Sequence, residues 1–143
     1  ADAIDGTPGP DIIDGKGGKD TINGKAGNDV VCAGNGNDLV HGDGGLDILL
    51  GEGGRDRLFG DAGKDVAIGG SNSSKLKPEI IKGGGGWDRL FGFQGKDNMF
   101  GGAGNDMLWG GPLYDKLYGG PGTDDECYDK ATNIKTGCEI TGP

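Results

Sequence analysis

The sequence predicts an all-β fold, a solenoid built from nine-residue repeats, and three observations support this prediction. Aspartate recurs every nine residues along most of the chain. Glycine precedes most of these aspartates by five residues and again by two, and an aliphatic residue follows most of them by two. A short period that is kept over a whole chain is typical of a solenoid, in which each repeat packs only on its neighbours.

The repeats can be followed from residue to residue as two columns. The aspartate column contains Asp2, Asp11, Asp20, Asp29, Asp38, Asp47, Asp56, Asp65, Asp88, Asp97, Asp106, Asp115 and Asp124. The aliphatic column contains Ile4, Ile13, Ile22, Val31, Val40, Leu49, Leu58, Ala67, Leu90, Met99, Leu108 and Leu117. The first glycine column is interrupted at Ala33 and the second at Leu113.

Composition limits the class of protein. Residues 1–143 are expected to form a single domain, yet only 32% of the chain is hydrophobic and 35 residues are glycine. Without the periodicity this composition would indicate disorder, but the repeat places the apolar residues where one narrow column can be buried. The chain carries 23 acidic and 14 basic residues, a formal charge of −9. This charge argues against a nucleic-acid partner and favours a multivalent cation, and no apolar run is long enough to span a membrane.

Four segments follow each other along the chain. A first block of repeats occupies residues 2–68 and a second block residues 83–126. Between them, residues 69–82 form a segment of 14 residues where a repeat has nine, and this segment lacks the aspartate. It contains Pro78, and we therefore expect a surface loop here. The period is lost from residue 127, so residues 127–143 are expected to cap the open end of the solenoid.

Each repeat has the chemistry of a calcium site. The first six residues are expected to form a turn and the last three a short strand, whose middle aliphatic residue points inward. Glycine allows backbone conformations that a side chain would obstruct, and aspartate supplies a hard oxygen ligand. With two repeats per turn, stacked turns lie about 4.8 Å apart. One Ca²⁺, which takes oxygen ligands at about 2.3–2.6 Å, can therefore bridge neighbouring turns.

The pattern resembles the glycine-rich nonapeptide G-G-x-G-x-D-x-U-x of the repeats-in-toxin (RTX) family over residues 2–126, apart from the insertion. The resemblance implies a right-handed parallel β-roll that holds calcium between turns through aspartate carboxylates and glycine-loop carbonyls. It implies that the ligands are Asp11, Asp20, Asp29, Asp38, Asp47, Asp56, Asp65, Asp88, Asp97, Asp106 and Asp115, with Asp2 and Asp124 as end members.

Two features depart from the family pattern. Leu113 breaks the second glycine column, so the loop before Asp115 is expected to bind calcium weakly. The segment 138–143 does not resemble the secretion signal of the one-step toxin export pathway, which leaves the export route open.

The opening Ala1–Ala3 would suit a mature end left by a signal peptidase, and Asn72–Ser74 match a glycosylation sequon.

The spacing of the aspartates gives an expected ion count. Six pairs of aspartates 18 residues apart lie in the first block and three in the second, which predicts about nine Ca²⁺ ions. Nine divalent ions would change the formal charge from −9 to about +9. A calcium-loaded rod of this charge would be able to bind an anionic polysaccharide.

The three cysteines suggest a compartment. Cys127 and Cys138 bracket a polar segment outside the repeats, whereas Cys32 lies within them. One terminal disulfide between Cys127 and Cys138, with Cys32 unpaired, fits an oxidising compartment. The alternative is three free thiols in a cytosolic protein. We favour the disulfide, because calcium at the affinities of extracellular modules also indicates an extracellular or cell-surface location.

The remaining candidates concern catalysis and partners. His41 is the single histidine and is expected to be a solvated side chain, since no nucleophile and base can be assembled around it, so no enzyme activity is expected. The outward column becomes apolar in its later half, from Leu50 to Tyr118. Neighbouring side chains that stack along the sheet explain this column, and the alternative is a docking face for another protein or for another copy of the chain.

These observations predict a secreted or surface-displayed, non-enzymatic module that folds on calcium binding. One alternative is a self-assembling filament subunit or an adhesive spacer. Another is the repeat region of a larger secreted hydrolase or toxin.

Overall fold

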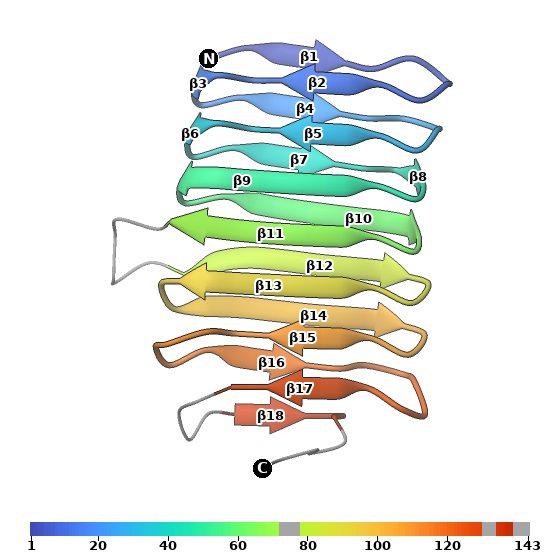
Figure 1. The fold of residues 1–143 in the computed structure, drawn as a ribbon, viewed down its shortest axis with the longest axis vertical. Helices are drawn as coiled ribbons and strands as arrows, with labels where there is room; N and C mark the ends of the chain where they lie inside the picture. The colour runs from blue at the N-terminus through green and yellow to red at the C-terminus, as the bar shows by residue number, and fades with distance from the viewer. Residues whose placement is uncertain (72–77, 130–133, 139–143) are drawn as a thin grey trace.

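The chain winds as a solenoid of parallel strands in two facing sheets, with about 7 turns (Figure 1). The structure, a computed structural model, describes residues 1–71, 78–129 and 134–138. These residues contain no helix, and hence none that could cross a membrane. The predicted all-β solenoid is confirmed. Asn72–Ser74, the glycosylation sequon, lies outside the described residues.

The main strands alternate between the two sheets, sheet A and sheet B, and the two-residue strands β3, β6 and β8 each stay in the sheet of the strand before them. Sheet A contains, in spatial order, β1 (Ala3–Asp5), β4 (Thr21–Asn23), β7 (Leu39–His41), β10 (Arg57–Gly63), β12 (Glu79–Gly85), β14 (Asp97–Ala103), β16 (Lys116–Tyr118) and β18 (Ile134–Thr136), with β8 (Gly44–Gly45) paired to β10. Sheet B contains β2 (Ile12–Asp14), β5 (Val30–Cys32), β9 (Ile48–Gly54), β11 (Val66–Ser71), β13 (Arg89–Gln94), β15 (Met107–Trp109) and β17 (Glu126–Tyr128), with β3 (Gly17–Gly18) and β6 (Asn35–Gly36) at its margin.

The register of the sheets reproduces two repeats per turn. Ile4 pairs with Ile22 and Ile22 with Val40, each 18 residues further on. Across the predicted insertion, Leu58 pairs with Ile81, so five surplus residues are left out of the ladder. Strand β11 continues to Ser71 and β12 begins at Glu79. Part of the segment predicted as a loop therefore belongs to the sheets.

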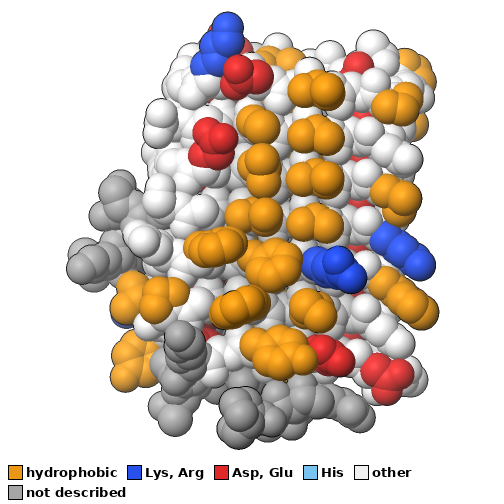
Figure 2. Space-filling model, in the orientation of Figure 1, with side chains coloured by type: hydrophobic (Ala, Val, Ile, Leu, Met, Phe, Trp, Pro, Cys, Tyr) orange, Lys and Arg blue, Asp and Glu red, His pale blue; other side chains and the backbone are white. Residues whose placement is uncertain are grey.

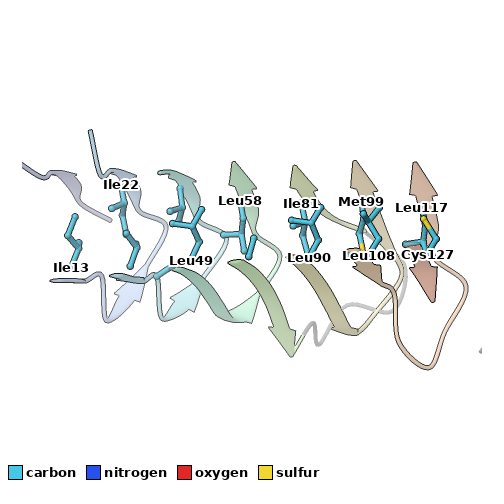
Figure 3. Close-up of a cluster of buried hydrophobic side chains, with 14 residues drawn as sticks. Ile13, Ile22, Leu49, Leu58, Ile81, Leu90, Met99, Leu108, Leu117 and Cys127 are labelled. Carbon is cyan, nitrogen blue, oxygen red and sulfur yellow. The ribbon is translucent and has the colours of Figure 1, made fainter. Parts of the chain in front are cut away.

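The core is one column of side chains from the middle of each strand, enclosed between the sheets (Figure 3). A strand points alternate side chains to opposite faces, so a three-residue strand contributes one inward residue. The buried column contains Ile13, Ile22, Val31, Val40, Leu49, Leu58, Ala67, Ile81, Leu90, Met99, Leu108, Leu117 and Cys127. Ile81 and Cys127 are additions to the predicted column, because they lie where the nine-residue period is interrupted.

The roll continues into the segment predicted as a cap. Leu108 pairs with Cys127 in β17, at a separation of 19 residues instead of 18, and Leu117 pairs with Lys135 in β18. One extra residue in the loop before β17 shifts the repeat by one position. The sequence period is lost at this point, but the pairing of parallel strands is not.

Outward side chains stack along the sheets. On sheet A the rings of His41 and Phe59 are stacked with centroids 4.7 Å apart, and Phe100 and Tyr118 stack at 4.9 Å. On sheet B, Phe91 and Trp109 meet at 6.3 Å in a tilted arrangement. These contacts between neighbouring turns support the interpretation of the apolar outward column as a stacking ladder.

Candidate metal centre

Buried carboxylates form two rows along the roll. Each carboxylate lies just before a strand or begins one. Because strands of the two sheets run in opposite directions, one row follows each edge of the roll. The residues of these rows are between 0 and 2% exposed: Asp20, Asp38, Asp56, Glu79, Asp97 and Asp115 in the sheet A row, and Asp29, Asp47, Asp65, Asp88, Asp106 and Asp125 in the sheet B row. Asp2 and Asp11, in the first turn, are more exposed.

One oxygen of most of these carboxylates is held by the backbone. The amide of Asp20 donates to Oδ1 of Asp38 at 2.8 Å, one turn further on. The same bond links Asp29 to Asp47 at 2.9 Å. It also crosses the insertion, from the amide of Asp65 to Oδ1 of Asp88 at 2.8 Å. The carboxylates are therefore stacked with one per turn in each row.

The second oxygen has no hydrogen-bond partner. This holds for Oδ2 of Asp20, Asp29, Asp38, Asp47, Asp56, Asp65, Asp88, Asp97, Asp106, Asp115 and Asp125, and for both oxygens of Glu79. A buried charged oxygen without a partner costs several kcal/mol, about the penalty that makes natural proteins pair such groups or bind them to metal. A row of such oxygens has the chemistry of a cation-binding site.

Glycine carbonyls approach these orphaned oxygens. A Cβ on Gly51 would lie 2.7 Å from Oδ2 of Asp56 and 2.6 Å from the carbonyl oxygen of Gly69 in the next turn. A Cβ on Gly24 would similarly lie 2.6 Å from Oδ2 of Asp29. The first glycine of the repeat therefore leaves space where a carboxylate and a carbonyl oxygen converge, the hard ligands that Ca²⁺ prefers.

The second glycine is required by the backbone itself. Gly45 has φ +151°, and a Cβ there would overlap the carbonyl oxygen of Gly27 in the preceding turn. Only glycine allows two turns to approach so closely in this conformation.

Burial changes the acidity of the rows. It raises the pKa of Asp56 and of Asp88 to about 7, and the charge of neighbouring carboxylates adds to the shift. The pKa of Glu79 rises to about 9, chiefly because of burial and then because of the charges of Asp97 and Asp56. The rows cannot all be ionised at neutral pH unless cations neutralise them. Oxygen-only ligands, stacking and orphaned charge all fit calcium.

The comparison with known families agrees with this geometry. Residues 5–40, 33–67, 41–74, 79–108 and 105–125 match the RTX calcium-binding nonapeptide repeat (4 copies). The chain belongs to this RTX repeat family. No curated protein and no solved structure gave a significant match. RTX repeats bind Ca²⁺ and their proteins are typically secreted, and the β-roll is a structural calcium-binding module and not a catalytic fold.

Asp125, and not Asp124, ends the carboxylate row of this RTX chain. Oδ1 of Asp125 accepts the amide of Asp106 at 2.9 Å, and Asp125 is 2% exposed. Asp124 is exposed, and its Oδ2 accepts a hydrogen bond from the side-chain Nδ2 of Asn105 at 3.4 Å. The structure therefore places Asp125 at the position in the row for which the nine-residue spacing predicts Asp124, because the last loop has one extra residue. Counting two residues back from the buried Cys127 would have found Asp125.

Glu79 is the row member that the sequence analysis missed. It begins β12, is fully buried and pairs in register with Asp97, so it fills the position that an aspartate takes in other turns. The search for aspartate at a nine-residue spacing could not find it, because the insertion shifts the period and the side chain is glutamate. The signal was Ile81, an aliphatic residue two positions later.

Leu113 does not expel its neighbouring carboxylate from the row. Asp115 is 2% exposed and accepts the amide of Asp97 on Oδ1 at 2.8 Å. Weaker calcium binding by this loop remains a prediction.

The predicted disulfide is present. Cys127 and Cys138 are joined, with Cα atoms 5.7 Å apart, and Cys32 is a half-buried free thiol. The bond ties the last described turn to the end of the core column.

Proposed function

We propose that this RTX chain is an extracellular, non-enzymatic structural module that folds when calcium enters its carboxylate rows. The observation that carries the proposal is the unbroken series of buried carboxylate oxygens without partners. Calcium, when bound, supplies the positive charge that compensates these buried negative oxygens. The proposed ligands are Asp2, Asp11, Asp20, Asp29, Asp38, Asp47, Asp56, Asp65, Glu79, Asp88, Asp97, Asp106, Asp115 and Asp125, together with loop carbonyls.

The register of the sheets also bears on the ion count. The sequence predicts about nine pairs of carboxylates, and the sheets add the pairs 56/79, 65/88 and 79/97 across the insertion. We therefore propose about twelve Ca²⁺ sites, one for each pair of carboxylates in neighbouring turns, with no gap in either row. Native mass spectrometry of the calcium-loaded chain counts the ions. A stoichiometry of nine or fewer would contradict a continuous pair of rows.

Removal of calcium tests the folding proposal directly. Mutual repulsion of stacked carboxylates and a core one side chain wide should leave the metal-free chain largely unfolded at neutral pH, so calcium-binding free energy appears as folding free energy. Circular dichroism should show strand signal in calcium, its loss in excess chelator and its return when calcium is restored. Added Mg²⁺ serves as the control and should not restore the signal, because it demands a smaller octahedral site. A strand spectrum that persists in excess chelator would overturn the proposal.

The wider biological setting has two alternatives. The chain could act as the repeat region of a larger secreted hydrolase or toxin, or as a filament subunit or adhesive spacer. The full-length gene product distinguishes the first alternative. Retention of the calcium-loaded chain on an anionic polysaccharide column, lost at high salt, would support the adhesive one.

Self-association has a specific surface to support it. Figure 2 shows two columns of hydrophobic side chains running along one face. The register of sheet B gives the columns as Ile12, Val30, Ile48, Val66 and Met107, interrupted by Arg89, and Cys32, Leu50, Ile68, Phe91 and Trp109. Ile12 is 88% exposed and Trp109 50%. Sedimentation of the calcium-loaded chain over a concentration series tests whether this face pairs with a second copy, and a constant monomer mass would exclude it.

A further inference from the structure

A second group of metal-ligating side chains lies outside the carboxylate rows, on the outer surface of sheet A. His41 ends β7, Asp43 follows two residues later, and Asp61 belongs to β10 in the next turn. One ligand atom from each residue lies within 4.8 Å of the others. The three residues come from neighbouring turns, so the fold itself brings them together.

The geometry of this group suits a coordination sphere. Nδ1 of His41 is 2.9 Å from Oδ2 of Asp61. A tetrahedral Zn²⁺ with bonds of about 2.0–2.1 Å holds its ligand atoms about 3.3–3.4 Å apart, so these two atoms lie within about half an ångström of that spacing. Asp43 lies opposite Asp61 across the ladder, where its carbonyl accepts the amide of Ala62 at 2.8 Å. Its side chain is exposed, and one of its carboxylate oxygens lies within 4.8 Å of the ligand atoms of His41 and Asp61.

The imidazole is held in place before any ion binds. Its ring stacks on Phe59 with an interplanar angle of 6°. Phe59 pairs with His41 in one neighbouring strand and with Lys82 in the other, so its ring lies between the imidazole and this lysine. The ammonium of Lys82 is 5.4 Å from the centroid of the Phe59 ring. A fixed ring presents its nitrogen with little loss of conformational freedom on binding.

In the described part of the chain, neither carboxylate beside the imidazole forms an ion pair with a lysine or arginine. Lys25 occupies the position of Asp43 one turn earlier, but its Nζ lies 3.8 Å from Oδ2 of Asp5. Within the described part of the chain, Asp43 forms no ion pair with a lysine or arginine, and Asp61 pairs only with His41. The group therefore offers two carboxylates and one imidazole nitrogen to an incoming cation.

We propose that His41, Asp43 and Asp61 form a site for a transition-metal dication, represented by Zn²⁺, that is separate from the calcium rows. The donor set decides the class of metal. Ca²⁺ takes oxygen ligands, whereas an imidazole with two carboxylates suits Zn²⁺ and its first-row neighbours. Water would fill the remaining positions of this exposed ion. The roll would then carry two kinds of metal at once, one inside its edges and one on its surface.

Zn²⁺ titration of the calcium-saturated chain tests the site. Isothermal calorimetry should show one Zn²⁺ bound per chain. Because His41 is the single histidine, its imidazole gives one set of ¹⁵N resonances, and these should shift on addition of Zn²⁺. His41→Gln and Asp61→Asn should each weaken Zn²⁺ binding by roughly 100-fold, as expected when a metal ligand and not only a supporting group is removed.

Glu52→Gln provides the matched control. Glu52 follows the first glycine of its repeat, as Asp43 does, and has the same φ of 68°, but it lies on sheet B with no imidazole beside it. This variant should bind Zn²⁺ as the unmodified chain does. The proposal fails if the calcium-saturated chain binds no Zn²⁺, if His41→Gln binds it unchanged, or if bound Zn²⁺ leaves the imidazole resonances in place. The resonance measurement uses the unmodified chain, so it decides the question even if a variant folds poorly.

Discussion

Most of the buried aspartates use their two carboxylate oxygens for different purposes, whereas neither oxygen of Asp97 has a hydrogen-bond partner. Oδ1 accepts a backbone amide from the preceding turn, as Asp38 does from Asp20 at 2.8 Å, and this bond fixes the side chain without any ion. Oδ2 is buried and has no partner in the protein. The residue therefore helps to stack the turns and at the same time presents a charged oxygen to the loop.

The end of the sheet B row allows a comparison of two adjacent aspartates. Asp125→Asn removes a buried charge from the row and should lower the free energy of unfolding of the calcium-loaded chain by about 1–3 kcal/mol, with loss of bound calcium. Asp124→Asn alters an exposed residue and should change it by less than about 0.5 kcal/mol. Thermal melts and calcium titrations of the two variants measure the difference. Equal losses would mean that the extra residue of this loop does not shift the row.

The adjacent glycines Gly44 and Gly45 allow a similar comparison of two variants. Gly45→Ala places a Cβ against the carbonyl oxygen of Gly27 at φ +151°, so this variant should be destabilised by about 2 kcal/mol or more. Gly44→Ala should be tolerated, because its nearest contact is the carbonyl oxygen of Lys25 at 3.9 Å. Chemical denaturation in saturating calcium compares them. A larger loss for Gly44→Ala would contradict the close approach of the turns.

At the scale of elements, short strands are ordered by their neighbours. Most strands of the first turns have three residues, and one inward side chain from each enters the core. Such strands have no stability of their own, so the order of each turn depends on the turn stacked against it. The last turn has a neighbour on one side only within the described residues, and the Cys127–Cys138 bond ties it to the core column.

Removal of this bond should destabilise the C-terminal turns. Cys138→Ser opens a loop that spans a sequence separation of 11, for which chain entropy predicts a loss of about 3 kcal/mol. Cys138 is the better position to change, since Cys127 also fills the core. Thermal melts under non-reducing conditions measure the loss, and Cys32→Ser, at the free thiol, is the control. Equal melting of the unmodified chain with and without reductant would show that the bond contributes nothing.

At the scale of the whole molecule, the two rows make stability depend on pH in opposite ways with and without calcium. Burial raises the pKa of Asp56 and Asp88 to about 7 and that of Glu79 to about 9. Groups with a raised pKa in the folded state stabilise the fold below their ordinary pKa, near 4, and this contribution is lost as pH rises toward 7 to 9. Calcium binding needs the ionised groups, so it weakens as pH falls.

The metal-free chain should therefore gain strand structure on acidification from pH 8 to about pH 5, and the calcium-loaded chain should release calcium over the same range. Circular dichroism of metal-free protein and a calcium electrode follow the two changes. A metal-free chain that loses strand signal on acidification would show that the carboxylate rows do not oppose its folding.

The sequence by itself determined the repeat, the solenoid, the inward aliphatic column and nearly all of the carboxylate rows. It could do so because a strand alternates its faces and a nine-residue period places the same chemistry at the same point of every half turn. Local order of this kind needs no knowledge of distant contacts.

The tertiary structure alone decided which residues keep the register where the period breaks. Glu79 replaces an aspartate after the insertion, and Asp125 replaces Asp124 after a one-residue extension, because backbone pairing between turns selects the residue that faces inward. The same pairing brings His41 beside Asp61, which lies 20 residues further along the chain. Spacing along the sequence cannot specify these partners, since stacking of turns tolerates added residues in the loops and restores alignment in the strands.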